Sequence, residues 1–320
     1  LYDCLEIFRG TGNWSSEHAA LGLAVHEGAD IDPARLVCRD LLQDSVAREL
    51  LALAARRVVR EWHSGVPCTS FGTLRRPRVR SRTEPWGFDP FEKVTALHNR
   101  LALRSCFILS VALQQGQHIS VEQPSGSVLF RLNCYRRLAE RGCVLSKFCF
   151  CAYGSPFLKR SVWLHNKPWL CDLERGCSCT GASPHFTVQG TFTHASVSLF
   201  KKMCKPSCEA VYGREPKAGQ SVATFSGAYP RGLVRRMASG SMRAGAGQQQ
   251  RMPAEALSRT AATLDLECAP TRPLPQPVFD QFEQRPWFED PEWIAEICQS
   301  KEFRLKFLYR FKRPGHITVM

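Results

Sequence analysis

The sequence contains no run of 18 apolar residues, so no membrane-spanning segment is expected, and it contains no secretory signal. It also shows no internal repeat, so a repeat architecture is not expected. Acidic residues are scarce: 29 Asp and Glu stand against 43 Lys and Arg, which gives a net charge of +14. A basic surface of this size favours a polyanionic partner, and nucleic acid fits that description best.

The composition is that of a folded protein. Of the 320 residues, 44% are hydrophobic and 22% are charged, which suffices for one large domain and a smaller appendage. The 15 cysteines are an odd number, and no signal peptide accompanies them. We therefore expect reduced thiols and a nuclear or cytoplasmic protein that is not secreted.

Apolar residues alternate or recur with helical spacing along the first half of the chain. Strands are predicted at 2–8, 23–26, 58–62, 118–122, 144–150 and 161–164. Helices are predicted at 15–21 (with Ser15 or Ser16 as the cap), 43–56, 91–115 and 128–141. This alternation predicts an α/β fold with a doubly wound, mostly parallel, Rossmann-like sheet. Ligands of such sheets bind beyond the carboxyl ends of the strands.

The first candidate site is the loop Phe8-Arg9-Gly10-Thr11-Gly12, between a strand and a helix. Its glycines permit a tight turn and a close approach to a ligand, and the following helix start offers donors. An ordinary turn would have the same sequence. An NAD-binding fingerprint would need a third glycine, and that position is Ser15.

A second candidate is Gly65-Val66-Pro67-Cys68, at the end of another strand. Most cysteines are structural, but a thiolate nucleophile requires this kind of exposed turn and a positive environment. An arginine-rich loop follows and could provide that environment. Its members are Arg75, Arg76, Arg78, Arg80 and Arg82.

Two further strand ends carry ionisable groups. Glu122-Gln123-Pro124 places a carboxyl group where it could donate a proton to a ring nitrogen, although a solvated Glu is an equal alternative. Lys159-Arg160 enters the last strand and could equally be a surface charge pair.

In this order, the four elements resemble the motifs of the cytosine-5 DNA methyltransferase family. The glycine loop resembles its adenosylmethionine loop, and Pro67-Cys68 resembles its nucleophile motif. Glu122-Gln123-Pro124 is similar to its Glu-Asn-Val motif, and Lys159-Arg160 to a reduced Gln-x-Arg-x-Arg motif. The resemblance covers residues 1–165, and more faintly 220–238, where the family returns a helix to the fold.

The resemblance implies an S-adenosylmethionine-dependent methyltransferase that acts on carbon 5 of cytosine in DNA. Cys68 would add to the flipped base, Glu122 would act at ring nitrogen 3, and Arg160 would hold the base carbonyl. For the cofactor it implies Phe8, Gly10, Thr11, Gly12, Glu27 with Asp30 as a rival, Asp40 and Pro67. The arginine loop would grip phosphates.

The sequence departs from the family pattern where Gln123-Pro124 replaces Asn-Val and where one arginine is missing. These departures leave a second interpretation open, a retroelement-derived nucleic-acid-binding domain with weak or absent catalysis. Methylation of RNA and an unrelated NAD enzyme are further alternatives.

The remaining chain is expected to be less regular. We expect a catalytic domain over 1–165, a short cysteine-rich, basic substrate-recognition region over 166–238, a flexible linker over 239–286 and a C-terminal segment over 287–320. Four residues could bind zinc, with Cys204 and Cys208 as rivals and structural thiols as the alternative. The four are Cys171, Cys177, Cys179 and His185. Residues 309–317 resemble the entry to a ribonuclease-H-like segment of tyrosine-recombinase retroelements, so we interpret the sequence as part of a longer polyprotein.

Overall fold

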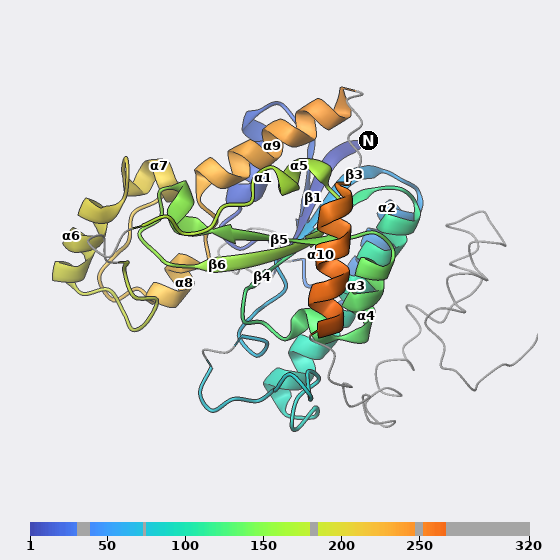
Figure 1. Ribbon diagram of the computed structural model, residues 1–320, viewed down its shortest axis with the longest axis horizontal. Coiled ribbons are helices and arrows are strands. Elements are labelled where there is room, and N and C mark those ends of the chain that lie inside the picture. The colour runs from blue at the N-terminus through green and yellow to red at the C-terminus, as the bar shows by residue number, and fades with distance from the viewer. Residues whose placement is uncertain (31–38, 73–74, 180–184, 247–251, 267–320) are drawn as a thin grey trace, which may run out of the picture.

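A six-stranded mixed β-sheet forms the centre of the computed structural model, with helices on both of its faces (Figure 1). The structure describes residues 1–266 apart from 31–38, 73–74, 180–184 and 247–251. The strand order is β2-β1-β3-β4-β6-β5. This α/β architecture is compatible with the Rossmann-like fold that the sequence predicts.

The first four strands pair in parallel. The two pairings at the other edge of the sheet, which both involve β6, are antiparallel. β1 pairs with β2 and β3, and β3 pairs with β4, all in parallel register. β6 is antiparallel to both of its neighbours, β4 and β5. The strands are β1 (Tyr2–Ile7), β2 (Val25–Ala29), β3 (Val59–Ser64), β4 (His118–Pro124), β5 (Val144–Cys149) and β6 (Arg160–His165).

Each predicted strand is present, and its ends differ from the prediction by at most three residues. The largest shift is at β2, which continues through Glu27 and Gly28 instead of ending at His26. A Cβ atom at Gly28 would lie 2.0 Å from the carbonyl oxygen of Glu6, so only glycine lets β2 pair this closely with β1. Glu27 therefore lies within the strand and not beyond its end.

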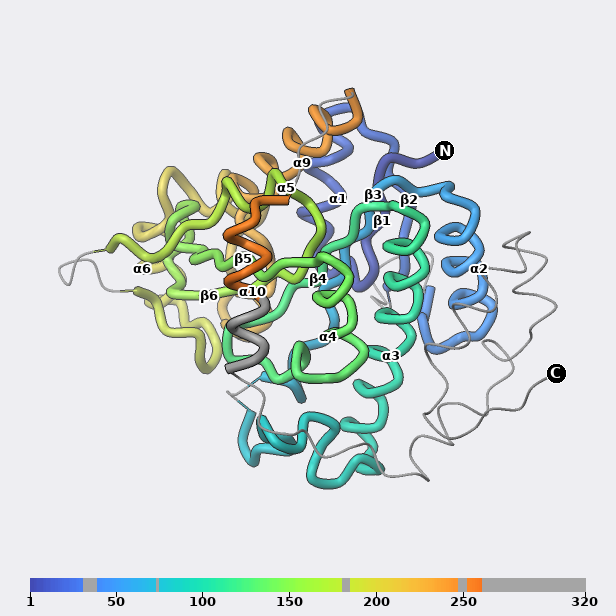
Figure 2. Tube along the Cα trace, turned by 45° about the vertical axis from the view of Figure 1, so that its right-hand side comes forward, coloured from blue at the N-terminus to red at the C-terminus, as the bar shows by residue number. Residues whose placement is uncertain are grey.

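The helices form two layers (Figures 1 and 2). One layer contains α1 (Asn13–Ala20), α5 (Pro168–Cys171) and α9 (Arg231–Gly245), and the other contains α2 (Asp44–Ala55), α3 (Lys93–Gln114), α4 (Asn133–Glu140) and α10 (Ala254–Leu266). The expected helix over 128–141 is split into a short 3-10 turn, η1 (Leu129–Arg131), and α4, because the buried Leu132 adopts an extended backbone. In the part of the chain that the structure describes, no helix has the length and apolar character needed to cross a membrane.

Three short helices form a small region beside the β5–β6 end of the sheet, away from α2 (Figure 2). They are α6 (His194–Met203), α7 (Cys208–Tyr212) and α8 (Val222–Ser226). Phe157, Phe192, Phe200 and Phe225 form the core of this region. The sequence predicted irregular structure here, and the prediction missed that aromatic residues spaced along short capped helices can build a core of their own.

The linker predicted over 239–286 overlaps two helices, so the prediction is wrong for its first part. Gly240 lets α9 pass closely over Trp169, since a Cβ atom there would lie 2.3 Å from the indole ring. α10 is attached to the sheet through Thr260, whose hydroxyl oxygen accepts a hydrogen bond of 2.8 Å from the backbone N–H of Leu145. The segment predicted over 287–320 lies outside the described residues.

Candidate functional site

The loop between β1 and α1 has an unusual backbone. Phe8, Gly10 and Gly12 all have positive φ angles of 61°, 52° and 74°. A phenylalanine rarely adopts this conformation, and such strain is often found at ligand sites. No protein atom lies within 4 Å of the position that a Cβ atom of Gly10 would occupy, so the loop offers an open backbone surface.

Of the two acidic residues that the sequence left as rivals, Asp30 is the one beside this loop. Its carboxylate accepts a hydrogen bond of 2.5 Å from the backbone N–H of Gly10. Glu27 is exposed and forms an ion pair of 2.5 Å with Arg39. Asp40 accepts a hydrogen bond of 2.8 Å from the N–H of Leu42, just before α2.

The Pro67-Cys68 turn follows β3 and is held by hydrogen bonds. The side-chain amide of Gln123 donates a hydrogen bond of 2.5 Å to the carbonyl of Val66, and the N–H of Gly72 donates one of 2.7 Å to the carbonyl of Cys68. Cys68 itself is exposed. The turn is therefore held by β4, and neighbouring protein atoms surround the sulfur of Cys68 although part of the residue is exposed.

The surroundings of Cys68 do not favour its thiolate. Burial of the sulfur by neighbouring protein atoms raises the pKa of the Cys68 thiol above its ordinary value, and the charge of Glu122 raises it further. The charge of Lys159 acts in the opposite direction. The sequence suggested that the arginine loop would supply this positive charge, but Lys159 is the cation that acts here.

Glu122 lies at the end of β4 with only 7% of its surface exposed. The hydroxyl of Ser161 on β6 donates a hydrogen bond to one carboxylate oxygen, and the hydroxyl of Tyr229 donates one of 3.5 Å to the other. Glu122 also influences the thiol of Cys68, so the two residues share one electrostatic neighbourhood. Two hydroxyl groups thus fix the orientation of this carboxyl group.

Tyr229 connects the elements of the candidate site. Burial raises the pKa of its phenol well above the ordinary value, and the charges of Glu122, Glu6 and Cys68 contribute in the same direction. Its backbone carbonyl accepts a hydrogen bond of 2.8 Å from Asn13 at the start of α1. The sequence placed Tyr229 in a returning segment but gave it no role, and its buried position just before α9 explains why it matters.

The two basic residues at the start of β6, Lys159 and Arg160, have different surroundings. The ammonium group of Lys159 donates a hydrogen bond of 3.2 Å to the carbonyl of Ser226 and lies 4.8 Å above the ring of Phe150. Arg160 is the first residue of β6 and is exposed. Lys159 is therefore a second candidate for the cation that sequence analysis assigned to Arg160.

The arginine-rich loop does not act as one set. Arg80 is only 5% exposed, and its guanidinium group donates hydrogen bonds to the side chains of Ser70 and Asn99 and to the backbone carbonyls of Pro85 and Thr95. This residue holds the loop together and, contrary to the prediction, does not offer its charge to a phosphate. Arg76, Arg78 and Arg82 are exposed, and Arg75 is half-buried.

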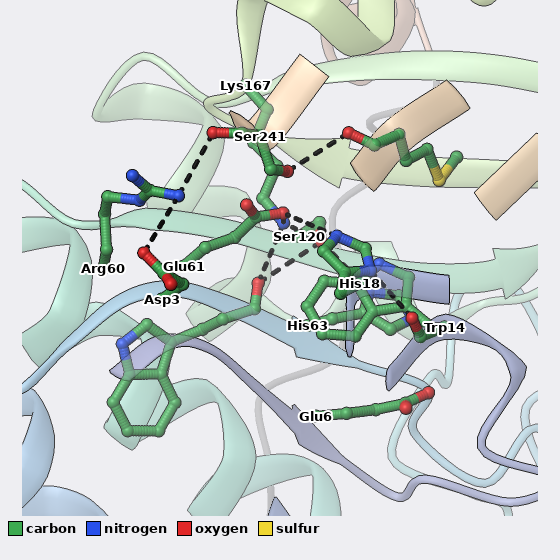
Figure 3. A network of polar contacts seen from close by, with 12 residues as sticks. Asp3, Glu6, Trp14, His18, Arg60, Glu61, His63, Ser120, Lys167 and Ser241 are labelled. Carbon is green, nitrogen blue, oxygen red and sulfur yellow. Dashed lines mark hydrogen bonds and ion pairs between the residues drawn. The ribbon is translucent and has the colours of Figure 1, made fainter. Parts of the chain in front are cut away.

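A buried ion pair lies under α1 and α9, on the same face of the sheet (Figure 3). The ammonium group of Lys167 lies 2.7 Å from Glu61 and 2.8 Å from the hydroxyl of Ser120. Burial alone would raise the pKa of Glu61, but Lys167 and His18 outweigh it and hold the value at about 2. Burial lowers the pKa of Lys167, and the charge of Glu61 opposes this effect.

A chain of hydrogen-bonding groups leads from this ion pair to Glu122. Ser120 lies 3.0 Å from Nδ1 of His63, and Nε2 of His63 lies 3.1 Å from the hydroxyl of Tyr229. Burial and the charge of Lys167 lower the pKa of His63 well below its ordinary value, so this imidazole is neutral at neutral pH. Sequence analysis missed these groups, although Glu61 and His63 within an otherwise buried strand were a visible signal.

Two groups of the described cysteines bear on metal binding. Cys151, Cys177, Cys179 and His185 bring their donor atoms within 4.8 Å of one another, a cluster that could hold a metal ion. Cys171 was predicted as a ligand, but its sulfur lies 4.0 Å from the hydroxyl of Ser146 and outside the cluster. The rivals Cys204 and Cys208 form a buried pair with sulfurs 2.9 Å apart.

The loop after β1, the turn after β3 and the end of β4 thus meet at one edge of the sheet, around Tyr229. The metal-ligand cluster is made by other residues, after β5 and after α5. Neither a family model nor a curated protein matches this sequence, so the assignment of a function depends on the site itself.

Proposed function

We propose that this protein is an S-adenosylmethionine-dependent methyltransferase that acts on carbon 5 of cytosine in DNA. The observation that carries the proposal is that the end of β4 and the turn with Cys68 are joined: Gln123, next to Glu122, donates a hydrogen bond of 2.5 Å to the carbonyl of Val66, and the charge of Glu122 acts on the Cys68 thiol. A strained glycine loop follows the neighbouring strand β1 at the same sheet edge. A nucleophile, a carboxyl group and a cofactor loop at one edge are the parts that this reaction requires.

The geometry of the glycine loop supports the cofactor assignment. The space beside Gly10, next to Thr11 and Gly12, can receive a polar ligand, and Asp30 adds a carboxylate there. In this proposal Glu27, Asp40, Phe8 and Pro67 complete the set that contacts the cofactor. When bound, S-adenosylmethionine supplies an electrophilic methyl group.

The reaction needs the target cytosine outside the base stack. The Cys68 thiolate would add to carbon 6, which makes carbon 5 nucleophilic toward the methyl group of the bound cofactor, with S-adenosylhomocysteine as the leaving group. Glu122, oriented by Ser161 and Tyr229, would stabilise the charge that develops at ring nitrogen 3. Transfer of the carbon-5 proton to water would then expel Cys68 as the thiolate, while Arg160 or Lys159 holds the base carbonyl.

The pKa of Cys68 adds a condition to this mechanism. Because its environment raises the pKa of the Cys68 thiol, the free protein holds this group as a thiol, and the proton has to leave as the sulfur adds to the cytosine ring. The exposed residues Arg76, Arg78 and Arg82 would supply phosphate contacts, and Arg80 would only support the loop. The protein would act in the nucleus or the cytoplasm.

Covalent trapping tests the proposal. The full chain is mixed with S-adenosylmethionine and duplex DNA containing 5-fluorocytosine, in which fluorine cannot leave as a proton does. We expect a denaturant-resistant complex with the unchanged protein and with Cys134→Ala, a half-buried cysteine on α4. Cys68→Ala should give none, and a complex that persists in this variant would overturn the assignment of the nucleophile.

A second candidate function is a retroelement-derived nucleic-acid-binding domain with weak or absent catalysis. The raised pKa of Cys68 and the Gln123-Pro124 sequence favour it. Binding of DNA and of adenosylmethionine without any trapped complex would support this second function. Trapping on RNA in preference to DNA would identify RNA as the substrate.

A further inference from the structure

A cluster of three thiols and one imidazole lies outside the proposed catalytic site. Cys151 belongs to η2 (Phe150–Tyr153), the short turn after β5. Cys177, Cys179 and His185 follow α5 along the chain. Their four donor atoms all lie within 4.8 Å of one another, although Cys151 is more than twenty residues away in sequence.

The spacing of the donor atoms agrees with tetrahedral coordination. Zinc bonds of about 2.3 Å to sulfur and about 2.0–2.1 Å to nitrogen place a sulfur and a nitrogen ligand roughly 3.5 Å apart. The sulfur of Cys177 lies 3.5 Å from Nε2 of His185. This pair therefore already has the separation of two ligands of one zinc ion.

The donor set selects the metal. Thiolates and imidazole suit zinc, whereas magnesium and calcium require oxygen ligands. Three sulfurs and one nitrogen also complete a tetrahedron without leaving a position for water, which is typical of structural and not of catalytic zinc. We propose that Cys151, Cys177, Cys179 and His185 bind one structural zinc ion.

The position of the site indicates what the ion would stabilise. Next to His185, Phe186 packs against Phe157 and Phe192 in the core of the α6–α8 region, with ring centroids 5.9 Å and 5.6 Å apart. On the other side, Arg175 accepts a backbone hydrogen bond of 2.8 Å from Cys149 at the end of β5. Zinc would join the end of β5 to the segment that leads into the α6–α8 region.

Neighbouring cysteines are weaker candidates. Cys149 lies 3.2 Å from the sulfur of Cys151 but is buried and is not among the four clustered residues. Cys204 and Cys208 provide only two sulfurs. Cys171 and Cys204 serve as internal controls, because Cys171 is near the ligands in sequence and Cys204 belongs to a separate pair.

Metal analysis of the purified full chain tests the proposal. We expect one zinc ion per chain by elemental analysis and native mass spectrometry, and the same for Cys171→Ser and Cys204→Ser. Cys179→Ser, which changes the exposed ligand, should lose most of the zinc. Equal zinc loss in Cys171→Ser, or a wild-type chain without zinc and with a Cys149–Cys151 disulfide, would overturn the assignment.

Cobalt substitution provides a readout that does not depend on the folding of any variant. Refolding or exchange of the wild-type chain with Co²⁺ should give the intense visible absorption of a tetrahedral site and the ultraviolet bands of thiolate ligation. A weak spectrum typical of octahedral oxygen ligation would contradict the proposed ligands. Neither measurement requires methyltransferase activity, so the zinc site and the proposed function can fail separately.

Discussion

The two faces of the sheet bury different kinds of side chain, although the same strands contribute to both. One face, under α2, α3 and α4, is almost entirely apolar, with Leu5, Trp62, Ile119, Val121 and Leu164 among its buried residues. The opposite face, under α1 and α9, carries polar and ionisable residues on the alternate strand positions. They are Glu6, Glu61, His63, Ser120, Glu122, Ser161 and His165.

Buried apolar side chains stabilise both faces, and on the α1/α9 face they include Trp14, Phe148 and Trp163, but only this face also buries a row of ionisable groups. Burying apolar surface contributes about 25 cal/mol per Å². A buried ion pair, in contrast, loses roughly as much in desolvation as it gains in attraction. A row of buried polar groups that continues to Glu122 therefore indicates a face that is kept for function.

The largest effect is expected from the ion pair. Lys167→Met leaves Glu61 buried without its cation and should lower the free energy of unfolding by about 3–5 kcal/mol. With Lys167 present, the low pKa of Glu61 adds stability above pH 4–5 that is lost only as the pH falls through about 2. In the variant the loss should be smaller at about pH 5 than at about pH 8, because the unpaired carboxyl group takes up a proton.

Urea denaturation of Lys167→Met and of the double variant Glu61→Gln/Lys167→Met measures this effect. The double variant should recover much of the loss, since it removes the unpaired charge. If the single variant is as stable as the unchanged protein, the ion pair is not the organising feature of this face.

On the apolar face, a cavity should lower the free energy of unfolding by a comparable amount, but without a dependence on pH. Ile119→Ala, in the strand that also carries Ser120 and Glu122, should cost about 3 kcal/mol at every pH. Its denaturation midpoint is measured across the same pH range as that of Lys167→Met. A pH-dependent loss in Ile119→Ala would show that the two faces are not energetically separate.

Glu6 on the polar face should give a pH dependence of the opposite sign to that of Glu61. Burial raises its pKa to about 8, even though Ser15 donates two hydrogen bonds to it. A raised acid pKa means that the unfolded chain ionises first, so stability declines between about pH 4.5 and 8. Glu6→Gln should remove this decline and stabilise the protein at pH 8 by on the order of 2 kcal/mol.

The measurement is the free energy of unfolding of Glu6→Gln and of the unchanged protein from about pH 5 to pH 8. Parallel curves would mean that Glu6 is ionised in the folded protein at neutral pH.

Local patterns explain which parts of the fold could be predicted. Alternation of apolar and polar residues located all six strands, because each strand carries its own pattern. The antiparallel insertion of β6 between β4 and β5 depends on long-range pairing, which no local pattern encodes. The end of β2 was missed for a related reason, since Gly28 serves a contact with Glu6 on the neighbouring strand.

Sequence patterns could single out candidate site residues that lie at the end of a strand. They could not single out residues that reach the same place from a distant part of the chain. Cys68 and Glu122 were singled out from their turns, and the pair Lys159-Arg160 was singled out with the role given to Arg160. Tyr229 becomes visible only when distant segments meet. Cys151, which belongs to the cluster that could hold a metal ion, was missed because Cys171 is nearer in sequence to the other three residues. Arg80 has the same sequence context as its exposed neighbours, and only packing distinguishes it.

The smallest effect on stability is expected from the loss of one tyrosine hydroxyl, which can be compared between the two faces. Tyr229→Phe removes a hydroxyl that contacts His63 and Glu122, and Tyr135→Phe removes one that donates a 3.0 Å hydrogen bond to the carbonyl of Ala102 on the apolar side. Each should lower the free energy of unfolding by about 1 kcal/mol. Only Tyr229→Phe should also slow covalent trapping on 5-fluorocytosine DNA, by roughly tenfold, which corresponds to about 1.4 kcal/mol in the barrier. Because both variants lose one buried hydroxyl, a general weakening of the fold would slow trapping equally in the two. Equal rates would reduce Tyr229 to a structural residue, whereas a selective loss would tie the polar face of the sheet to the chemistry of Glu122.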